Sequence, residues 1–284
     1  MTKKTKDTTD KVPLPSGRGW VWVHNQYQHL SDTIARLPRL MDEGQGDVVY
    51  DSRNRVARFV VDGLTLMVKR YKRVNAIQQV VYTFFRKTKA ERAYRFALEF
   101  LQRGIDTPQP VAYIEERHHG LFTTGYFVSL EVAGTETSLL LREVKDYPAN
   151  LAEAVARQVV FMHSRGVLHG DLNLSNFLCQ TNEQSAGNEK QEDAYHFCMI
   201  DTNRSHFVNC PAAQEGQSKT EGWETFPSDR ECMQNMVRLT HRRDLYEDLI
   251  RRYARLRGWD ADVTSAQALQ IGRASCRERV SVAV

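Results

Sequence analysis

Residues Met162 to Asn176 read M-H-S-R-G-V-L-H-G-D-L-N-L-S-N, and a second polar group, I-D-T-N-R, follows at Ile200–Arg204. In the first group Asp171 precedes Asn176 by five positions, and Asn176 leads into a hydrophobic run. Asp201 comes at the end of a second hydrophobic run. Phosphoryl transfer depends on positioning and charge neutralisation more than on covalent catalysis. An Asp, an Asn and a second Asp in this spacing are typical of that chemistry.

Each residue type has a role in such a reaction. Asp171 can orient an acceptor hydroxyl and accept its proton. Asn176 and Asp201 provide the hard oxygen ligands that Mg²⁺ prefers, and Mg²⁺ bridges the phosphates of a nucleotide. We expect His169 to hold the loop by hydrogen bonding and His163 to pack at a helix end. The competing interpretation, a polar turn that only caps its neighbours, leaves the joint spacing unexplained.

Upstream of this loop the sequence predicts strands, one helix and further strands. Val56–Val61 and Leu64–Lys69 flank Asp62-Gly63, which predicts a hairpin because both turn residues tolerate positive φ. Apolar residues at helical spacing predict a helix over Lys89–Gln102, ending before Gly104. The other expected strands are Val48–Tyr50, Val111–Ile114 and Tyr126–Leu130.

Downstream the pattern is mainly helical. Asn150 is expected to cap a helix, with Glu153 as its capping-box partner, and Gly166 follows the helix end at Arg165. A polar insert, residues 180–193, separates two expected strands. Those strands are Phe177–Cys179 and Phe197–Ile200, and a last helical stretch is expected over Arg230–Arg257.

Taken together, these motifs resemble the protein-kinase-like superfamily and most closely the lipopolysaccharide-core (Kdo/heptose) kinase family. Met162–Asn176 resembles the catalytic loop, Ile200–Arg204 the D-x-N-R form of the magnesium loop, and Arg86–Glu115 the helix and strand of the small lobe. The resemblance covers Val48 to Gly258. It implies a two-lobed α+β fold, with a small antiparallel β-sheet and one helix in the N-lobe and a mainly helical C-lobe.

The same resemblance assigns a nucleotide site. It implies ATP and Mg²⁺ as cofactors, with Lys69 pairing with the α- and β-phosphates. Glu91 is expected to be the carboxylate partner of Lys69, and Glu99 is the alternative. The sequence departs from the pattern in having no glycine-rich loop, since the turn at Asp51–Arg55 reads D-S-R-N-R.

Two more departures concern the catalytic and magnesium loops. Asn203 replaces the glycine of protein kinases, and Asn tolerates left-handed geometry. Gly170 replaces the arginine of phosphorylation-regulated protein kinases, and no A-P-E follows. These last two features favour a small-molecule or lipid-linked sugar acceptor over a protein.

The sequence therefore predicts an ATP- and Mg²⁺-dependent kinase that phosphorylates a sugar hydroxyl, such as Kdo or heptose of the lipopolysaccharide inner core. A soluble metabolite, an aminoglycoside-like compound or a protein remains an alternative acceptor. A catalytically silent nucleotide-binding pseudokinase scaffold is an alternative of another class. Nucleic acid is not expected as a partner, because no recognised module accompanies the basic residues.

The composition of the chain limits its expected location and its expected metal content. The 284 residues carry a formal net charge of +4, with no membrane-length apolar run and no signal-peptide core, so a cytoplasmic location is expected. The five cysteines form no C-x-x-C pair, which argues against a zinc site. Ile271–Val280 resembles the translation of a sequencing adapter. We expect a disordered leader at 1–18, an N-lobe at 19–132, a C-lobe at 133–270 and a non-native, unpacked tail at 271–284.

Basic residues gather on the predicted small lobe. Eight lie between Lys69 and Arg92, interrupted by V-V-Y-T-F-F at Val80–Phe85. Such a surface suits an anionic glycolipid or an anionic membrane, which would place the protein peripherally at the inner face of an inner membrane. The alternative is an ordinary solvated face with aromatic residues in the core.

Overall fold

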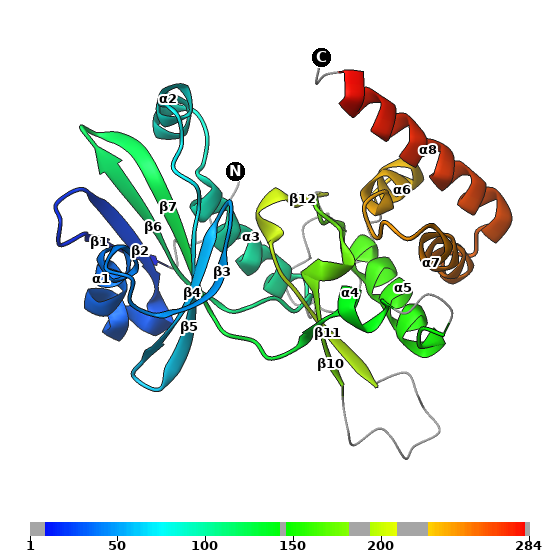
Figure 1. The fold of residues 1–284 in the computed structure, drawn as a ribbon, viewed down its shortest axis with the longest axis horizontal. Helices are drawn as coiled ribbons and strands as arrows, with labels where there is room; N and C mark the ends of the chain where they lie inside the picture. Colours follow the sequence, from blue (N-terminus) through cyan, green and yellow to red (C-terminus); the bar gives the residue numbers. More distant parts are fainter. Residues whose placement is uncertain (1–8, 143–145, 182–193, 209–226, 282–284) are drawn as a thin grey trace, which may run out of the picture. The chain divides into compact units, whose positions relative to one another are not determined.

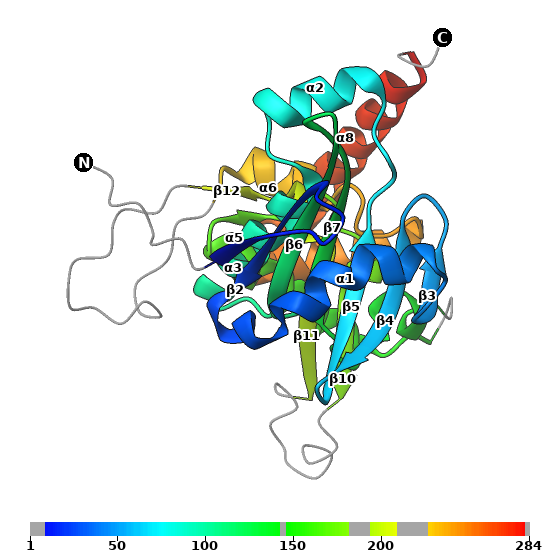
Figure 2. The same cartoon turned by 90° about the vertical axis from the view of Figure 1, so that its left-hand side faces the viewer.

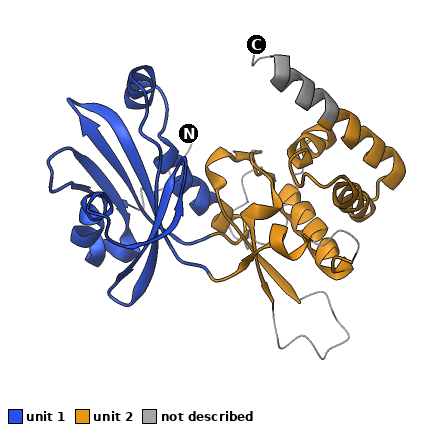
Figure 3. Cartoon of the chain, in the orientation of Figure 1, with its two compact units in different colours: residues 1–99, 108–132 blue, residues 100–107, 133–284 orange. Residues whose placement is uncertain are grey.

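The computed structural model describes residues 9–142, 146–181, 194–208 and 227–281, with the backbone alone for 273–281. The chain divides into two compact units, coloured separately in Figure 3. Unit 1 comprises residues 1–99 and 108–132, and unit 2 comprises 100–107 and 133–284. The short segment 100–107 belongs with unit 2 because Phe100 and Ile105 are buried in that unit's core.

Unit 1 is built on a seven-stranded sheet in the order β1-β2-β6-β7-β5-β4-β3, with every neighbouring pair antiparallel (Figure 1). Its strands are β1 (Thr9–Pro13), β2 (Gly19–His24), β3 (Asp47–Asp51), β4 (Arg55–Val61), β5 (Leu64–Arg70), β6 (Pro110–His118) and β7 (Leu121–Leu130). Its helical segments are η1 (Asn25–Leu30), α1 (Ser31–Asp42), α2 (Ala76–Phe84) and α3 (Lys89–Gln102), although the end of α3 from Phe100 onward belongs to unit 2.

The two faces of this sheet are covered by different helices, α1 and α3, as Figures 1 and 2 show. On one face Ile34, Leu37 and Met41 of α1, spaced three and four residues apart, are buried in a cluster with aliphatic residues of the sheet. On the other face Ala93 and Tyr94 of α3 pack in a separate cluster with Tyr113 of β6 and with Tyr71, which follows β5. Alternate residues of a central strand therefore belong to different environments.

Several predicted elements of unit 1 are confirmed. β4 and β5 pair from Arg55↔Arg70 to Val61↔Leu64, and the turn residues Asp62 and Gly63 have φ of 49° and 76°. These positive angles are the type I′ geometry that an Asp-Gly pair favours. The helix predicted over Lys89–Gln102 is α3, with the same bounds.

The prediction of a disordered leader through Arg18 is wrong for its second half. Thr9–Pro13 forms β1 and pairs with β2 over five register positions. The Lys11 ammonium lies 4.1 Å from the ring centroid of Trp20, and Leu14 is buried in the core under α1. A short strand with few apolar residues is therefore held by pairing and by these contacts. Residues 1–8 lie outside the described residues.

The helices α1 and α2 are additional to the one helix predicted for this half. Within the described chain α2 contains no buried residue, and it rests on β7 through Thr83, whose hydroxyl accepts from the Phe122 amide at 2.9 Å. Its opposite side exposes Ile77 and Phe84 by 77% and 69%, and Phe85 just after it by 78%. The expectation of core aromatics at Val80–Phe85 does not hold for the two phenylalanines.

Unit 2 is mainly helical, with two small sheets in the orders β11-β10-β8 and β12-β9. Its helical segments are α4 (Thr137–Leu140), α5 (Ala149–Ser164), η2 (Leu174–Asn176), η5 (Thr202–Arg204), α6 (Asp229–Met236), α7 (Arg243–Leu256) and α8 (Ala261–Ser281). Its strands are β8 (Thr135–Glu136), β9 (Val167–Leu168), β10 (Phe177–Thr181), β11 (Tyr195–Met199) and β12 (His206–Phe207). Apolar residues of α5 and α7 form the centre of its core.

Two details of the predicted helices are wrong. Asn150 lies inside α5 instead of capping it, because the helix begins one residue earlier, at Ala149 after Pro148. The expected partner Glu153 bonds instead to Arg252 of α7, at 3.0 Å. The helical stretch expected over Arg230–Arg257 consists of two helices, α6 and α7.

The stretch from Ile271 onward is not without structure. α8 continues through it to Ser281, so the expectation that the tail forms no element is wrong for its backbone. Upstream in α8, Thr264, Ser265 and Ala268 are buried. The side chains of 273–281 and all of 282–284 lie outside the described residues. In the described part of the chain, no helix combines the length and the apolar character needed to cross a bilayer.

Candidate active site

The predicted catalytic loop lies in unit 2 between β9 and η2. β9 pairs with β12 through Leu168↔His206, which holds the start of the loop. At the end of the loop, the Asn173 side chain accepts from the Ser175 amide and caps η2. Asn176 Nδ2 then donates to the backbone oxygen of Asp171 at 2.8 Å. This hydrogen bond spans the five-residue spacing and folds the two ends of the motif together.

Asp201 is brought to the same place by the β10–β11 hairpin. Phe177 pairs with Met199, and the Ile200 amide donates to the Asn176 carbonyl at 2.9 Å. Asp201 follows directly, in a left-handed conformation with φ of 58°. Its Oδ1 accepts from Asn203 Nδ2 at 2.5 Å. Asn203 therefore supports this carboxylate at the position where protein kinases have glycine.

Two further residues join the loop to this turn. His169 is fully buried, and its Nε2 lies 2.9 Å from the Ile200 carbonyl oxygen, with its ring against Phe100. Burial lowers the pKa of His169, and the hydrogen bond to the Ile200 carbonyl opposes this shift. At Gly170 an added Cβ would lie 2.0 Å from the Arg204 carbonyl oxygen. The glycine is therefore required by the close approach of two backbone segments.

The carboxylate of Asp171 faces two arginines. Arg238 Nη1 donates to Oδ1 at 3.1 Å, and Arg204 Nη1 lies 3.6 Å from Oδ2. Arg238 is positioned by its neighbour, because the Leu174 amide donates to the carbonyl of the buried Leu239 at 3.0 Å. Neither arginine could be recognised from the sequence as part of the site. The D-T-N-R motif contained Arg204, but nothing near Arg238 marked it as part of the site.

The donor set at this turn fits Mg²⁺. Because Asn176 Nδ2 is used by the Asp171 carbonyl, the amide oxygen is the ligand atom it can offer, and Asp201 offers a carboxylate. Mg²⁺ is commonly held by one or two protein oxygens together with substrate phosphates and water. Within the described residues, no group of three His, Cys, Asp or Glu forms a cage that could hold a metal without such a substrate.

The predicted nucleotide residues lie in unit 1. Lys69 is on β5 opposite Phe127 of β7, and its Nζ is 5.6 Å from the ring centroid of Tyr71. This places Lys69 on the α3 face of the sheet. Glu91, in the first turn of α3, accepts from Arg95 at 2.8 Å and lies 3.8 Å from Lys87. The pairing of Lys69 with Glu91 stays a prediction.

Comparison with solved structures identifies the fold. A structure described as WaaP in complex with acyl carrier protein superposes with a TM-score of 0.55 and 20% sequence identity, over 91% of this chain and 98% of that chain. The two-lobed, protein-kinase-like α+β class predicted from the sequence is thereby confirmed. The antiparallel sheet lies in the first unit and the helices dominate the second.

Sequence comparisons identify the family. The model of the lipopolysaccharide kinase (Kdo/WaaP) family matches residues 41–215, more than half of the chain, and the chain belongs to that family. Two 3-deoxy-D-manno-octulosonic acid kinases of Vibrio vulnificus, from strains YJ016 and CMCP6, are 26% and 25% identical over 148 residues. Each alignment covers 50% of this chain and 62% of the relative, so the chain spans less than two thirds of the curated relatives it matches.

Proposed function

We propose that the protein is an ATP- and Mg²⁺-dependent kinase that phosphorylates a sugar hydroxyl, with Kdo or heptose of the lipopolysaccharide inner core as the acceptor. The observation that carries this proposal is the convergence of Asp171, Asn176 and Asp201 at one turn of unit 2. Membership in the lipopolysaccharide kinase family and the names of the Vibrio relatives support the choice of acceptor.

The proposed reaction assigns a role to each side chain. Asp171 orients the acceptor hydroxyl and takes its proton as the oxygen attacks the γ-phosphorus. The bond from that phosphorus to the β–γ bridging oxygen breaks, and ADP leaves. Asn176 and Asp201 would hold Mg²⁺, which offsets the charge of the phosphates. Lys69 would pair with the α- and β-phosphates, and Glu91 would be its partner.

The catalytic loop itself favours a non-protein acceptor. Position 170 has no room for a side chain, since a Cβ would meet the Arg204 carbonyl. The arginine that serves phosphorylation-dependent regulation in protein kinases therefore has no equivalent at this position. A catalytically silent scaffold would not require the hydrogen bond between Asn176 and Asp171 or the support of Asp201 by Asn203. These contacts favour an active enzyme.

The exposed side of α2 supports a peripheral position at a membrane that carries the acceptor. Ile77, Val80 and Phe84 follow one another at helical spacing and are exposed, and Phe85 continues the same apolar surface. Arg86 and Lys87 follow directly and are exposed too. An amphipathic helix with apolar and cationic residues suits the interface of an anionic bilayer. The proposed location is the cytoplasmic face of an inner membrane.

The acceptor is tested by incubating the purified chain with Mg²⁺ and γ-labelled ATP. The panel contains a Kdo-bearing lipid A precursor, a heptose-bearing inner-core fragment, an aminoglycoside and a generic protein substrate. We expect label in the Kdo- or heptose-bearing compound, and little in a reaction with the Asp171→Asn variant. Transfer only to the aminoglycoside or the protein would overturn the acceptor assignment.

A further inference from the structure

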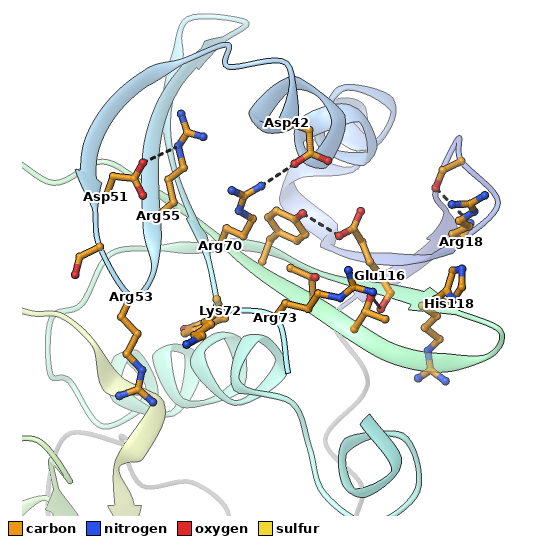
Figure 4. Close-up of a pocket in the computed structure, with 17 residues that line it drawn as sticks. Arg18, Asp42, Asp51, Arg53, Arg55, Arg70, Lys72, Arg73, Glu116 and His118 are labelled. Carbon is orange, nitrogen blue, oxygen red and sulfur yellow. Dashed lines mark hydrogen bonds and ion pairs between the residues drawn. The ribbon is translucent and has the colours of Figure 1, made fainter. Parts of the chain in front are cut away.

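Unit 1 contains a pocket of about 530 Å³ whose lining is dominated by charged and polar side chains (Figure 4). Seven arginine and lysine residues line it against three carboxylates, so its formal charge is +4 with His118 neutral. Its volume is within the range of small-molecule sites, but most such sites are predominantly apolar. A pocket with this lining suits an anion.

Two arginines of the pocket, Arg55 and Arg70, lie on the sheet face opposite Lys69. Arg70 is in register with Arg55 of β4 and with Tyr126 of β7, and residues directly opposite in antiparallel strands share a face. Tyr126 belongs to the core cluster under α1, so these residues share the α1 face. Lys69, the neighbour of Arg70 on β5, points to the α3 face. Arg55 and Arg70 thus project from the face opposite Lys69, whereas Tyr71, which also lines the pocket, packs on the α3 face beside Lys69.

The three carboxylates of the pocket already have partners. Asp42, at the end of α1, accepts from Arg70 at 2.7 Å, and Asp51 lies 3.7 Å from Arg55. Glu116 accepts from the Tyr126 hydroxyl at 2.9 Å. Burial raises the pKa of Glu116, and the hydrogen bond from Tyr126 opposes this shift. The three carboxylates therefore hold Arg70, Arg55 and Tyr126 in place, and the lining keeps a positive net charge.

Other cations of the lining remain available. Among the described residues, no ion pair is made by four of them: Arg18, Arg53, Lys72 and Arg73. Arg55 Nε is buried and has no hydrogen-bond acceptor in the described part of the chain, since Asp51 is too distant. A buried guanidinium nitrogen without an acceptor is costly, and a bound oxyanion would supply one.

We propose that this pocket binds a phosphomonoester group, independently of the nucleotide. Guanidinium groups match phosphate oxygens in a forked geometry and are weakly hydrated, which suits them to this ligand. The phosphomonoester belongs either to a soluble sugar phosphate or to a lipid headgroup. The site goes beyond the proposed kinase reaction, because it uses none of the side chains assigned to phosphoryl transfer. It does include the Asp51–Arg55 turn, which stands where protein kinases have the glycine-rich loop, so competition with ADP distinguishes the two sites.

The test measures binding directly, without turnover. Glucose 1-phosphate is titrated into the full chain by calorimetry, with glucose as the uncharged control. In a second arm the chain is sedimented with phosphatidylcholine vesicles that contain or lack phosphatidic acid. The Arg70→Gln/Arg73→Gln variant removes two pocket cations, and Arg36→Gln/Arg39→Gln removes two from α1 outside the pocket. Thermal melting confirms that each variant is folded.

We expect saturable binding of glucose 1-phosphate or of the phosphatidic acid vesicles, and no binding of glucose. Binding should weaken at least about tenfold in Arg70→Gln/Arg73→Gln, since each lost charge-assisted bond is worth about that factor, and stay unchanged in the α1 variant. It should persist with saturating Mg²⁺ and ADP and in Lys69→Met. Which arm responds identifies the source of the phosphate. Three results would each overturn the proposal: binding that ADP abolishes, an equal loss of binding in both double variants, or no binding in either arm.

Discussion

Arg238 Nη1 donates to Oδ1 of Asp171 at 3.1 Å, although the two residues are 67 positions apart in the chain. The contact is possible because Leu239 accepts from the Leu174 amide and so brings the segment after α6 against the catalytic loop. A proposed base whose carboxylate is held by an arginine has a defined orientation toward its acceptor. Arg238 is therefore inferred to be a positioning residue for Asp171.

Replacing Arg238 by Gln should lower kcat about tenfold to a hundredfold, because a small misplacement of a reacting group is sufficient for such a loss. The KM for ATP should change little. Arg243→Gln is the matched control, since Arg243 bonds to Glu247 on the surface of α7. Steady-state kinetics on both variants checks this. An equal decrease of kcat in the two variants would remove the special role of Arg238.

Gly170 provides a second test of the loop. In Gly170→Ala the new Cβ would collide with the Arg204 carbonyl oxygen, so the backbone must shift, at a cost of about 1–3 kcal/mol, and kcat should fall. Gly104→Ala is the comparison: Gly104 has φ of 73° and open space around its Cβ position. That variant should lose about 1 kcal/mol through backbone strain alone and keep its kcat. Denaturant unfolding and kinetics separate the two effects.

The local geometry of the proposed catalytic turn could be predicted from the sequence, because the information for it is local. The spacing from Asp171 to Asn176 and the strand before Asp201 are written in consecutive residues, and so are the Asp62-Gly63 turn and the bounds of α3. The spacing of apolar residues and the residue types in the turns are sufficient to predict such elements. The same holds for His169, whose hydrogen bond to the loop turn agrees with its expected role.

What the sequence did not predict depends on tertiary contacts. β1 is stabilised by pairing with β2, and Arg238 reaches Asp171 only through the fold of unit 2. The sequence predicts one basic surface for the run that follows Lys69. In the structure Arg70 and Arg73 line the pocket of unit 1, whereas Arg86 follows α2. The fold of unit 1 decides where each of these residues lies, and composition does not contain that information.

Stability should depend on pH through His163. This residue is buried between Tyr253 and Asn235, at 2.8 and 3.1 Å, and burial lowers its pKa from 6.5 to about 4. The unfolded chain therefore binds more protons than the folded chain between these two values. Stability is fully present above pH 6.5 and is lost as the pH falls toward 4, by on the order of 3 kcal/mol for this group.

Urea unfolding of the wild type and of His163→Gln between pH 7 and pH 4 measures this dependence. The wild type should lose more stability over this window than the variant. His169 keeps part of the slope in both proteins, since burial lowers its pKa as well. Parallel curves for the two proteins would show that His163 does not titrate as described.

The exposed face of α2 predicts membrane binding. Phe84→Ser should reduce co-sedimentation with anionic vesicles severalfold, because a phenylalanine exposed by 69% can enter the interface, whereas Val60→Ser should not. Val60, on β4, is exposed by 72% but lies away from α2. Arg86→Gln/Lys87→Gln should weaken binding most at low salt, where the Debye length exceeds about 10 Å. Loss of binding in Val60→Ser to the same extent would mean that α2 has no special role.

The central claim is that unit 2 transfers a phosphoryl group through Asp171 with Mg²⁺ held by Asn176 and Asp201. The most direct measurement compares Asp171→Asn and Asp201→Asn by ATP-dependent transfer to the Kdo-bearing acceptor and by Mg²⁺-dependent nucleotide binding. Asp171→Asn should lose most turnover, on the order of a hundredfold or more, while binding nucleotide nearly as the wild type does. Asp201→Asn should lose turnover and Mg²⁺-dependent nucleotide binding together. Wild-type turnover in both variants would contradict the assignment of this site as a kinase centre.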